Sequence, residues 1–215
     1  MNYSFRDCRA FTLVELLMVI AIIGVIAGVA AVSISGSTSA ASISTGGSRL
    51  AGFLESAREN AVLKRQPTAV AMLSANGEAA GRVFISLQYI PASGGTAASW
   101  KPVSGWEILP NGVVSKLDDA DYDANLPRAF SPGTTPAVSP ALPSLTYKAK
   151  AYAPKTDYGY LVFLPSGGLY QSPGCAVKLV AGISESSGVS YIGNGANYLR
   201  IIINDATGRV KIVRP

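Results

Sequence analysis

The sequence predicts an α+β protein in which one long N-terminal helix packs on antiparallel β-sheet. Three observations lead to this class: an uncharged stretch over residues 16–48, one amphipathic helical pattern directly after it, and short strand patterns separated by turns from residue 68 onward. A length of 215 residues suits one domain with an appendage. Apolar residues make up 48% of the chain and charged residues 14%, a composition that excludes general disorder.

The composition also excludes several functional classes. The chain has no histidine, which removes Ser-His-Asp and Cys-His catalysis and most zinc sites. An enzyme would then need a Ser-Lys or carboxylate pair, and the sequence singles out neither, so no catalytic residue and no cofactor is predicted. The net charge of +5 includes no run of Lys and Arg, so no nucleic-acid partner is predicted. Cys8 precedes the apolar run and Cys175 lies far beyond it, which predicts no disulfide.

The N-terminal apolar run has the length of a membrane span. As a helix, residues 11–34 would extend about 36 Å, enough to cross a bilayer with some tilt. Arg6 and Arg9 precede the run and would keep the N-terminus in the cytoplasm, with everything after the run outside. A secretory signal peptide cut near Val29-Ala30-Ala31 and a plain membrane anchor both fit this pattern. Neither explains a carboxylate at Glu15.

Glu15 requires a partner, because a carboxylate at the centre of an apolar span costs about 2.5–3.5 kcal/mol on insertion scales. Phe11 lies four residues earlier and therefore on the same helix face. A cut between Ala10 and Phe11 would create an α-amino group there. Its ordinary pKa of about 7.7–8.0 leaves it mostly cationic at neutral pH. Glu15 would then have a counter-charge in its own chain or in a neighbour.

The segment Ala10-Phe11-Thr12-Leu13-Val14-Glu15-Leu16-Leu17 resembles the class III prepilin signal of type IV pilins and type II secretion pseudopilins. The resemblance implies that a prepilin peptidase removes residues 1–10, with Phe11 becoming an N-methylated N-terminus. It also implies that Glu15 guides assembly and that residues 11–34 form both anchor and filament core. Ala10 departs from the family, which usually has Gly there.

The resemblance further implies where the protein lies and what it contacts. The chain would be a single-pass inner-membrane protein with a cytoplasmic N-terminus and an extracytoplasmic, periplasmic domain, and it would then enter a filament. Its partners would be the prepilin peptidase, other pilin or pseudopilin subunits and an inner-membrane assembly platform.

The segment after the apolar run allows two interpretations. Residues 35–48 are rich in Ser, Thr, Gly and Ala, which suits either a flexible linker or a weakened continuation of the helix, with Gly46-Gly47 the expected break. From Arg49 a helical pattern returns, and its apolar stripe would lie on a sheet. The stripe consists of Leu50, Phe53, Leu54, Ala57 and Ala61. Pro67 would end this helix. The globular domain is therefore expected to occupy residues 49–215.

Short strands make up the predicted remainder of the domain. The candidates are Thr68–Leu73, Arg82–Ile90, Gly105–Leu109, Leu145–Tyr152, Tyr160–Leu164, Ala176–Val180, Tyr198–Asn204 and Arg209–Val213. The last two flank Asp205-Ala206-Thr207-Gly208, a hairpin turn with Gly for the positive φ. Five prolines between Pro127 and Pro143 predict an exposed, extended loop.

This order of elements narrows the resemblance. The helix with its Arg58-Glu59-Asn60-Ala61, the following Pro67 and the closing pair of strands are similar to the H-type minor pseudopilins and FimT-like pilins, which implies a pilin-like fold. Trp100 with Trp106-Glu-Ile-Leu-Pro-Asn-Gly-Val-Val also resembles the prepilin-type family Verru_Chthon cassette protein D. The function implied is that of a minor pilin or pseudopilin, a structural subunit of a type IV pilus or type II secretion pseudopilus. The alternative is a membrane-anchored binding or adhesion domain that uses the prepilin export route.

Three further patterns have plain structural interpretations. The acidic cluster Asp119–Asn125 presents several oxygen ligands and could contribute to a calcium site, but it lacks the EF-hand glycine and glutamate, so a solvated loop is favoured. Gly193-Asn-Gly195 lacks the third glycine and the strand-to-helix setting of a dinucleotide fingerprint. Leu164-Pro-Ser-Gly-Gly168 faintly resembles a sorting motif, but no apolar tail follows it. Both glycine-containing segments are predicted to be turns.

Overall fold

The computed structural model describes residues 13–214 except 76, 117–125, 131–136 and 196, and for residues 24–39, 194 and 195 it describes the backbone alone. The chain forms two compact units, Met1–Thr38 and Ser39–Pro215. Helix α1, Leu13–Lys64, begins in the first unit and ends in the second. The strands are β1 Thr68–Leu73, β2 Val83–Ile90, β3 Ser99–Pro102, β4 Glu107–Ile108, β5 Val113–Ser115, β6 Leu145–Tyr147, β7 Lys150–Tyr152, β8 Tyr158–Phe163, β9 Cys175–Glu185, β10 Gly188–Tyr191, β11 Tyr198–Ile203 and β12 Val210–Val213, with a short 3₁₀ helix, η2, at Ile192–Gly195.

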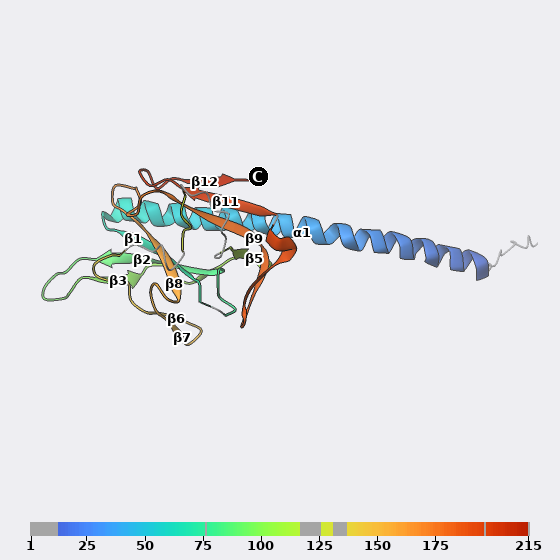
Figure 1. The fold of residues 1–215 in the computed structure, drawn as a ribbon, viewed down its shortest axis with the longest axis horizontal. Coiled ribbons are helices and arrows are strands. Elements are labelled where there is room, and N and C mark those ends of the chain that lie inside the picture. Colours follow the sequence, from blue (N-terminus) through green and yellow to red (C-terminus); the bar gives the residue numbers. More distant parts are fainter. Residues whose placement is uncertain (1–12, 76, 117–125, 131–136, 196, 215) are drawn as a thin grey trace, which may run out of the picture. The chain divides into compact units, whose positions relative to one another are not determined.

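The strands of the second unit form two main sheets, and every strand pair is antiparallel. The first sheet has the order β3-β2-β1-β8, with β4 beside the start of β2. The second has the order β10-β9-β11-β12, with β5 on the other edge of β9. A separate hairpin joins β6 to β7. One helix with antiparallel sheets agrees with the predicted α+β class (Figure 1).

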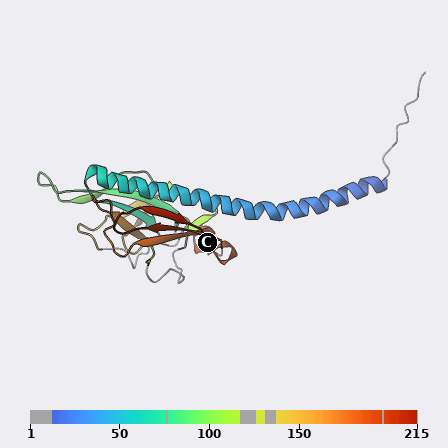
Figure 2. The same cartoon turned by 90° about the horizontal axis from the view of Figure 1, so that it is seen from above.

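The part of α1 that belongs to the second unit lies along one side of both sheets (Figure 2). Its apolar stripe is buried as predicted, with Phe53 partly buried and in edge-to-face contact with Phe84 at 4.8 Å. The same core contains inward residues of both sheets, such as Val70 of β1 and Ile201 of β11. A stripe with helical spacing thus supplies the apolar surface that holds the two sheets together.

The central strands of the first sheet, β1, β8 and most of β2, are buried on both faces, which explains why β1 is a continuous apolar run. Val70 and Met72 face the helix side, whereas Ala69, Ala71 and Leu73 belong to a second core on the opposite face. Residues from the 137–152 segment cover that second core. They are Val138, Leu142, Leu145, Tyr147 and Tyr152.

The prediction of an exposed loop from Pro127 to Pro143 is only partly correct: its described parts form no named strand, as predicted, but some of their side chains are buried. Phe130 and Leu142 are both buried, each in a different core. Gly159 allows this path, because a Cβ there would lie 2.0 Å from the backbone oxygen of Phe130. Arg128 forms an isolated bridge with Ala176 of β9, and the prolines of this segment do not prevent burial of its apolar side chains.

The predicted break at Gly46-Gly47 is also wrong, because α1 is continuous through both residues. Both glycines are buried against the second sheet. A Cβ on Gly47 would lie 2.8 Å from the methyl carbons of Leu199, and one on Gly46 would lie 3.1 Å from Val113. These glycines therefore permit close approach of helix and sheet instead of bending the helix.

Helix α1 ends at Lys64, before Pro67, and backbone hydrogen bonds close its C-terminus. Arg65 has a φ of +52°, its N–H donates to Val62 O, and the next N–H, of Gln66, donates to Ala61 O. This pattern is a Schellman motif, which usually has glycine where Arg65 stands. Pro67 follows it, as expected beyond a helix C-terminus.

Each predicted strand overlaps a strand of the structure, but one predicted strand is in fact two strands. The predicted single strand Leu145–Tyr152 is a hairpin, because Lys148 and Ala149 both take positive φ and reverse the chain. Thr68–Leu73 matches β1, and the two final strands pair around the predicted turn at 205–208. The sequence pattern does not predict the short strands β3, β5 and β10.

Candidate assembly site and surface of the globular unit

The predicted cleavage site, Ala10 and Phe11, lies outside the described residues. Glu15 lies in the first turn of α1, where the partial positive charge of the helix N-terminus favours a carboxylate. From Leu13 to Ile23 every residue is exposed, and most of these side chains are large and apolar. This helix surface therefore presents one carboxylate among exposed apolar side chains.

Within the described part of the chain, no helical segment has the length and apolarity needed to cross a membrane.

A second group of polar side chains joins α1 to the C-terminal hairpin of the globular unit. Arg58 Nε donates to Thr207 O at 2.7 Å and to Gly167 O at 3.2 Å, so one guanidinium holds two turns. Glu55 Oε1 accepts the backbone N–H of Val210 at 2.9 Å, and Glu55 Oε2 lies 3.4 Å from Arg58 Nη1. These bonds dock the start of β12 on the helix.

Two further polar contacts hold α1 at its entry into the globular unit. Arg49 pairs with Glu107 of β4, and Arg214, just after β12, donates to the hydroxyl of Ser44. The helix is thus tied to the first sheet and to the end of the chain. Exposed pairs of this kind contribute little to stability, but they fix the orientation of the parts they join.

The tryptophans of the Trp100–Trp106 region serve the fold. Trp100 is only 6% exposed, and its Nε1 donates to Pro140 O at 2.8 Å. Trp106 donates to Thr146 O at 3.0 Å and meets the ring of Tyr147 edge-to-face at 5.2 Å. Both indoles thereby hold the 137–152 segment on the first sheet. An exposed aromatic patch here would have favoured the binding-domain alternative, and these contacts do not provide one.

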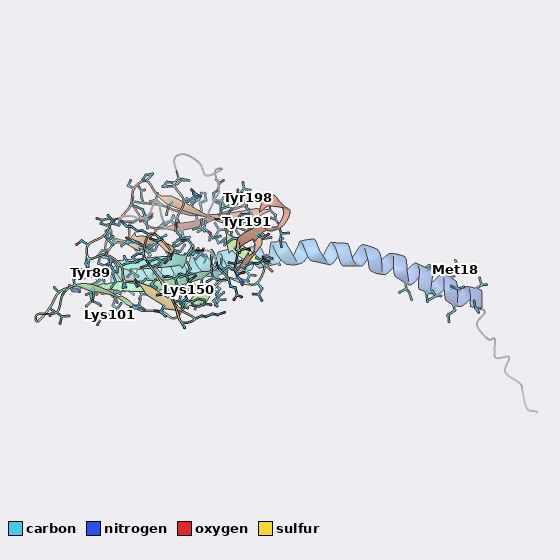
Figure 3. All side chains as sticks on the ribbon, turned by 60° about the horizontal axis from the view of Figure 1, so that its bottom comes forward. Met18, Tyr89, Lys101, Lys150, Tyr191 and Tyr198 are labelled. Atoms are coloured by element: carbon cyan, nitrogen blue, oxygen red, sulfur yellow. The ribbon has the colours of Figure 1, made fainter. Side chains whose placement is uncertain are left out.

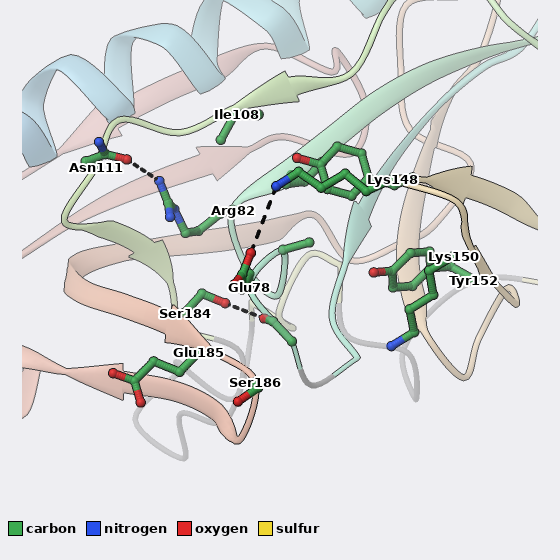
Figure 4. Close-up of a pocket in the computed structure, with 14 residues that line it drawn as sticks. Glu78, Arg82, Ile108, Asn111, Lys148, Lys150, Tyr152, Ser184, Glu185 and Ser186 are labelled. Atoms are coloured by element: carbon green, nitrogen blue, oxygen red, sulfur yellow. Dashed lines mark hydrogen bonds and ion pairs between the residues drawn. The ribbon is translucent and has the colours of Figure 1, made fainter.

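A groove of about 770 Å³ opens where the β6–β7 hairpin, the 77–82 turn and the end of β9 meet (Figure 4). Lys148 Nζ lies 3.9 Å from Glu78 Oε2 in the groove. Arg82 Nη2 donates to Asn111 Oδ1 at 2.9 Å. Burial raises the pKa of Tyr152 on the groove wall, with smaller contributions from Tyr147 and Asp157. The groove is lined by both cationic and anionic side chains, and Lys148 and Glu78 among them contact each other. This lining therefore does not indicate any one class of ligand.

The remaining sequence motifs are turns or lie outside the described residues. Leu164–Gly168 closes a tight turn with hydrogen bonds in both directions, and Ile192–Gly195 forms η2 between two strands. The acidic segment Asp119–Asn125 is not described, so calcium binding there stays a prediction. Across the described ranges, no group of three or more His, Cys, Asp or Glu side chains could hold a metal ion. Cys175 is a buried free thiol whose pKa is raised to about 12 by burial.

Comparison with known proteins identifies two family models along the chain. The prokaryotic N-terminal methylation motif matches residues 5–31, and the type II transport protein GspH model matches residues 47–207. No curated protein sequence matches. Two similar solved structures are both of the minor pseudopilin EpsH from the type II secretion system of Vibrio cholerae. One is 13% identical with a TM-score of 0.42, covering 80% of this chain and 97% of EpsH; the other is 14% identical with a TM-score of 0.41, covering 81% and 94%.

One family model matches within the first unit of the chain, and the other matches within the second. The methylation motif covers the segment with Glu15, and the GspH model covers the globular part of α1 and most of the strands. They confirm the predicted pilin and pseudopilin family and its function as a minor pseudopilin with a prepilin motif. The narrower resemblance to Verru_Chthon cassette protein D stays a prediction. The chain belongs to the family of the type II transport protein GspH.

Proposed function

We propose that this protein is a minor subunit of a type II secretion pseudopilus, cut between Ala10 and Phe11 by a prepilin peptidase and N-methylated on Phe11. The apolar run from Phe11 to Ile34 anchors the new subunit in the inner membrane, with the Ser39–Pro215 unit on the periplasmic side. From there the subunit passes, through the assembly platform, into a filament of other pseudopilins. Its role is structural, and none of its side chains acts as a catalyst.

The observation that carries this proposal is the single carboxylate of Glu15 on an exposed apolar helix surface. A subunit that leaves lipid for a filament must bury its N-terminal amine among apolar groups, and an unpaired buried charge is costly. Glu15 supplies the opposite charge, either to its own amine or to that of a neighbouring subunit. A plain membrane anchor would need the apolar run but not the carboxylate.

Mass analysis of the N-terminus tests the processing step. We expect the native protein to begin at Phe11 with one added methyl group. A mature protein that begins after Ala30 or Ala31 would refute the proposal in favour of an ordinary signal peptide.

Replacement of Glu15 tests assembly. Glu15→Val and the near-isosteric Glu15→Gln should both leave processing and membrane insertion intact, because removing a charge lowers the cost of insertion. Both should be strongly depleted from sheared filaments. Glu59→Gln is the matched control, since Glu59 is an exposed carboxylate of the same helix within the globular unit. Equal filament incorporation of the Glu15 variants and the control would favour the anchored binding domain instead.

A further inference from the structure

The β6–β7 hairpin forms one wall of the groove but belongs to neither main sheet. Among the described strands, β6 and β7 pair only with each other (Figure 1). A hairpin of two strands is marginally stable at best in water unless it packs against other elements. The position of this hairpin therefore depends on contacts that its side chains make with the rest of the globular unit.

The base of the hairpin is anchored in the second core. Leu145 and Tyr152 face each other across the two strands and are only 4% and 5% exposed. Trp106 Nε1 donates to the backbone oxygen of Thr146 at 3.0 Å. These contacts fix the ends of the hairpin that join it to the chain, so any movement is confined to residues nearer the turn.

The tip of the hairpin, residues 147–150, is held less firmly than the base. Lys148, Ala149 and Lys150 are exposed, and Tyr147 is partly exposed. Lys148 and Ala149 have φ of +46° and +64°, a region that residues with a Cβ rarely adopt. A two-residue turn with both φ values positive favours Asn-Gly, so this tip carries backbone strain. A change in the conformation of the turn would release that strain.

An ion pair connects the tip to the opposite wall of the groove (Figure 4). Lys148 Nζ lies 3.9 Å from Glu78 Oε2, and the two side chains are 70% and 80% exposed. Such an exposed pair contributes little and is weakened further by salt. Lys150 Nζ instead lies 5.1 Å from the centre of the Tyr152 ring, within the hairpin itself. The contact across the groove is therefore weak enough to break and re-form while the base stays in the core.

We propose that residues 147–150 act as a lid on the groove, which closes when Lys148 pairs with Glu78 and opens when that pair breaks. Opening also lets Lys148 and Ala149 leave their strained conformation. In the open state, solvent or a ligand gains access to the groove of about 770 Å³ from the side of the hairpin. The lid lies wholly within the globular unit and does not depend on the proposed function.

A distance measured across the groove tests the lid on the full chain in detergent micelles. Spin labels are placed on the tip by Ala149→Cys and on the β9–β10 turn, across the groove, by Ser186→Cys, and both positions are exposed (Figure 4). A Cys8→Ser background and the burial of Cys175 keep other thiols from reacting. At low salt the labels should show one dominant short distance. High salt should raise the ratio of open to closed chains by a factor of about 2–5, because it screens a weak ion pair.

Lys148→Ala should produce the same shift at low salt and abolish the response to salt. Lys101→Ala is the matched control, since Lys101 is an exposed lysine of β3 outside the groove lining, and it should leave the distances unchanged (Figure 3). A single distance that neither salt nor Lys148→Ala alters would overturn the inference. If Lys148→Ala does not fold, the salt series on the labelled chain with Lys148 decides alone.

Hydrogen exchange of the unlabelled chain gives a second readout. Amides of residues 147–150 should exchange far faster than those of β1, which is fully buried, because a lid opens without unfolding of the unit. Ala149→Gly relieves strain in the closed turn and should slow exchange at the tip several-fold while leaving β1 unchanged. Unchanged or faster exchange at the tip of this variant would also overturn the inference.

Discussion

Replacing the glycines of α1 one at a time separates helix propensity from helix–sheet packing. A Cβ on Gly52 would meet nothing within 4 Å, whereas one on Gly47 would lie 2.8 Å from Leu199, which is itself buried. Gly→Ala inside a helix gains about 0.5–1 kcal/mol. Gly52→Ala should therefore stabilise the 39–215 fragment by that amount. At about 2–4 °C per kcal/mol for a unit of this size, Tm should rise by about 1–4 °C.

At Gly47 the same gain is opposed by overpacking, which costs about 1–3 kcal/mol. Gly47→Ala should therefore be neutral to destabilising by about 2 kcal/mol. Gly46→Ala should fall between the other two variants, because its new Cβ would lie 3.1 Å from Val113. Urea unfolding of the three variants, followed by circular dichroism, gives the order directly. If Gly47→Ala stabilises as much as Gly52→Ala, the helix does not press on the sheet at Leu199 and the packing argument fails.

Three further outcomes are expected. A fragment that begins at Ser48 should be about 2–5 kcal/mol less stable to urea than one that begins at Ser39, because it lacks the buried Ile43, and equal stability would refute this. Cys175 should resist alkylation at pH 8 in the folded protein and react at once in denaturant, since burial raises the pKa of its thiol to about 12; fast labelling of the native state would show that the thiol is accessible. Hydrogen bonds from Ser172 and the N–H of Ala206 lower the pKa of Asp205, so its contribution to stability is lost as the pH falls through that lowered value. Ser172→Ala should raise this pKa in an NMR titration, and an unchanged titration would exclude the hydroxyl as a cause.

Local patterns allowed much of the fold to be predicted from the sequence. The stripe from Leu50 to Ala61 has unambiguous helical spacing, and the turn at 205–208 carries the glycine that its conformation needs. Both signals lie in a few adjacent residues and do not depend on the rest of the chain. The prepilin motif around Glu15 is equally local, although its role in assembly still needs the experiment above.

The errors concern information that is not local. Because glycine weakens an isolated helix, Gly46-Gly47 alone predicts a break, but Leu199 and Val113, more than 60 residues away, make small side chains necessary there. The hairpin at Lys148-Ala149 lacks the Asn-Gly signal that usually marks such a turn. Phe130 is buried because residues 126–130 run beside β9. A proline-rich stretch has no hydrophobic periodicity from which this burial could be predicted.

The bond between Glu55 and Val210 has a consequence for aggregation. An edge strand such as β12 offers backbone groups to any extended chain, including another copy of this protein. Glu55 occupies the position that the carbonyl of an added strand would take on Val210. A copy that extended the sheet at this point would have to displace a carboxylate that also contacts Arg58. Lateral growth into cross-β stacks is therefore disfavoured at this edge.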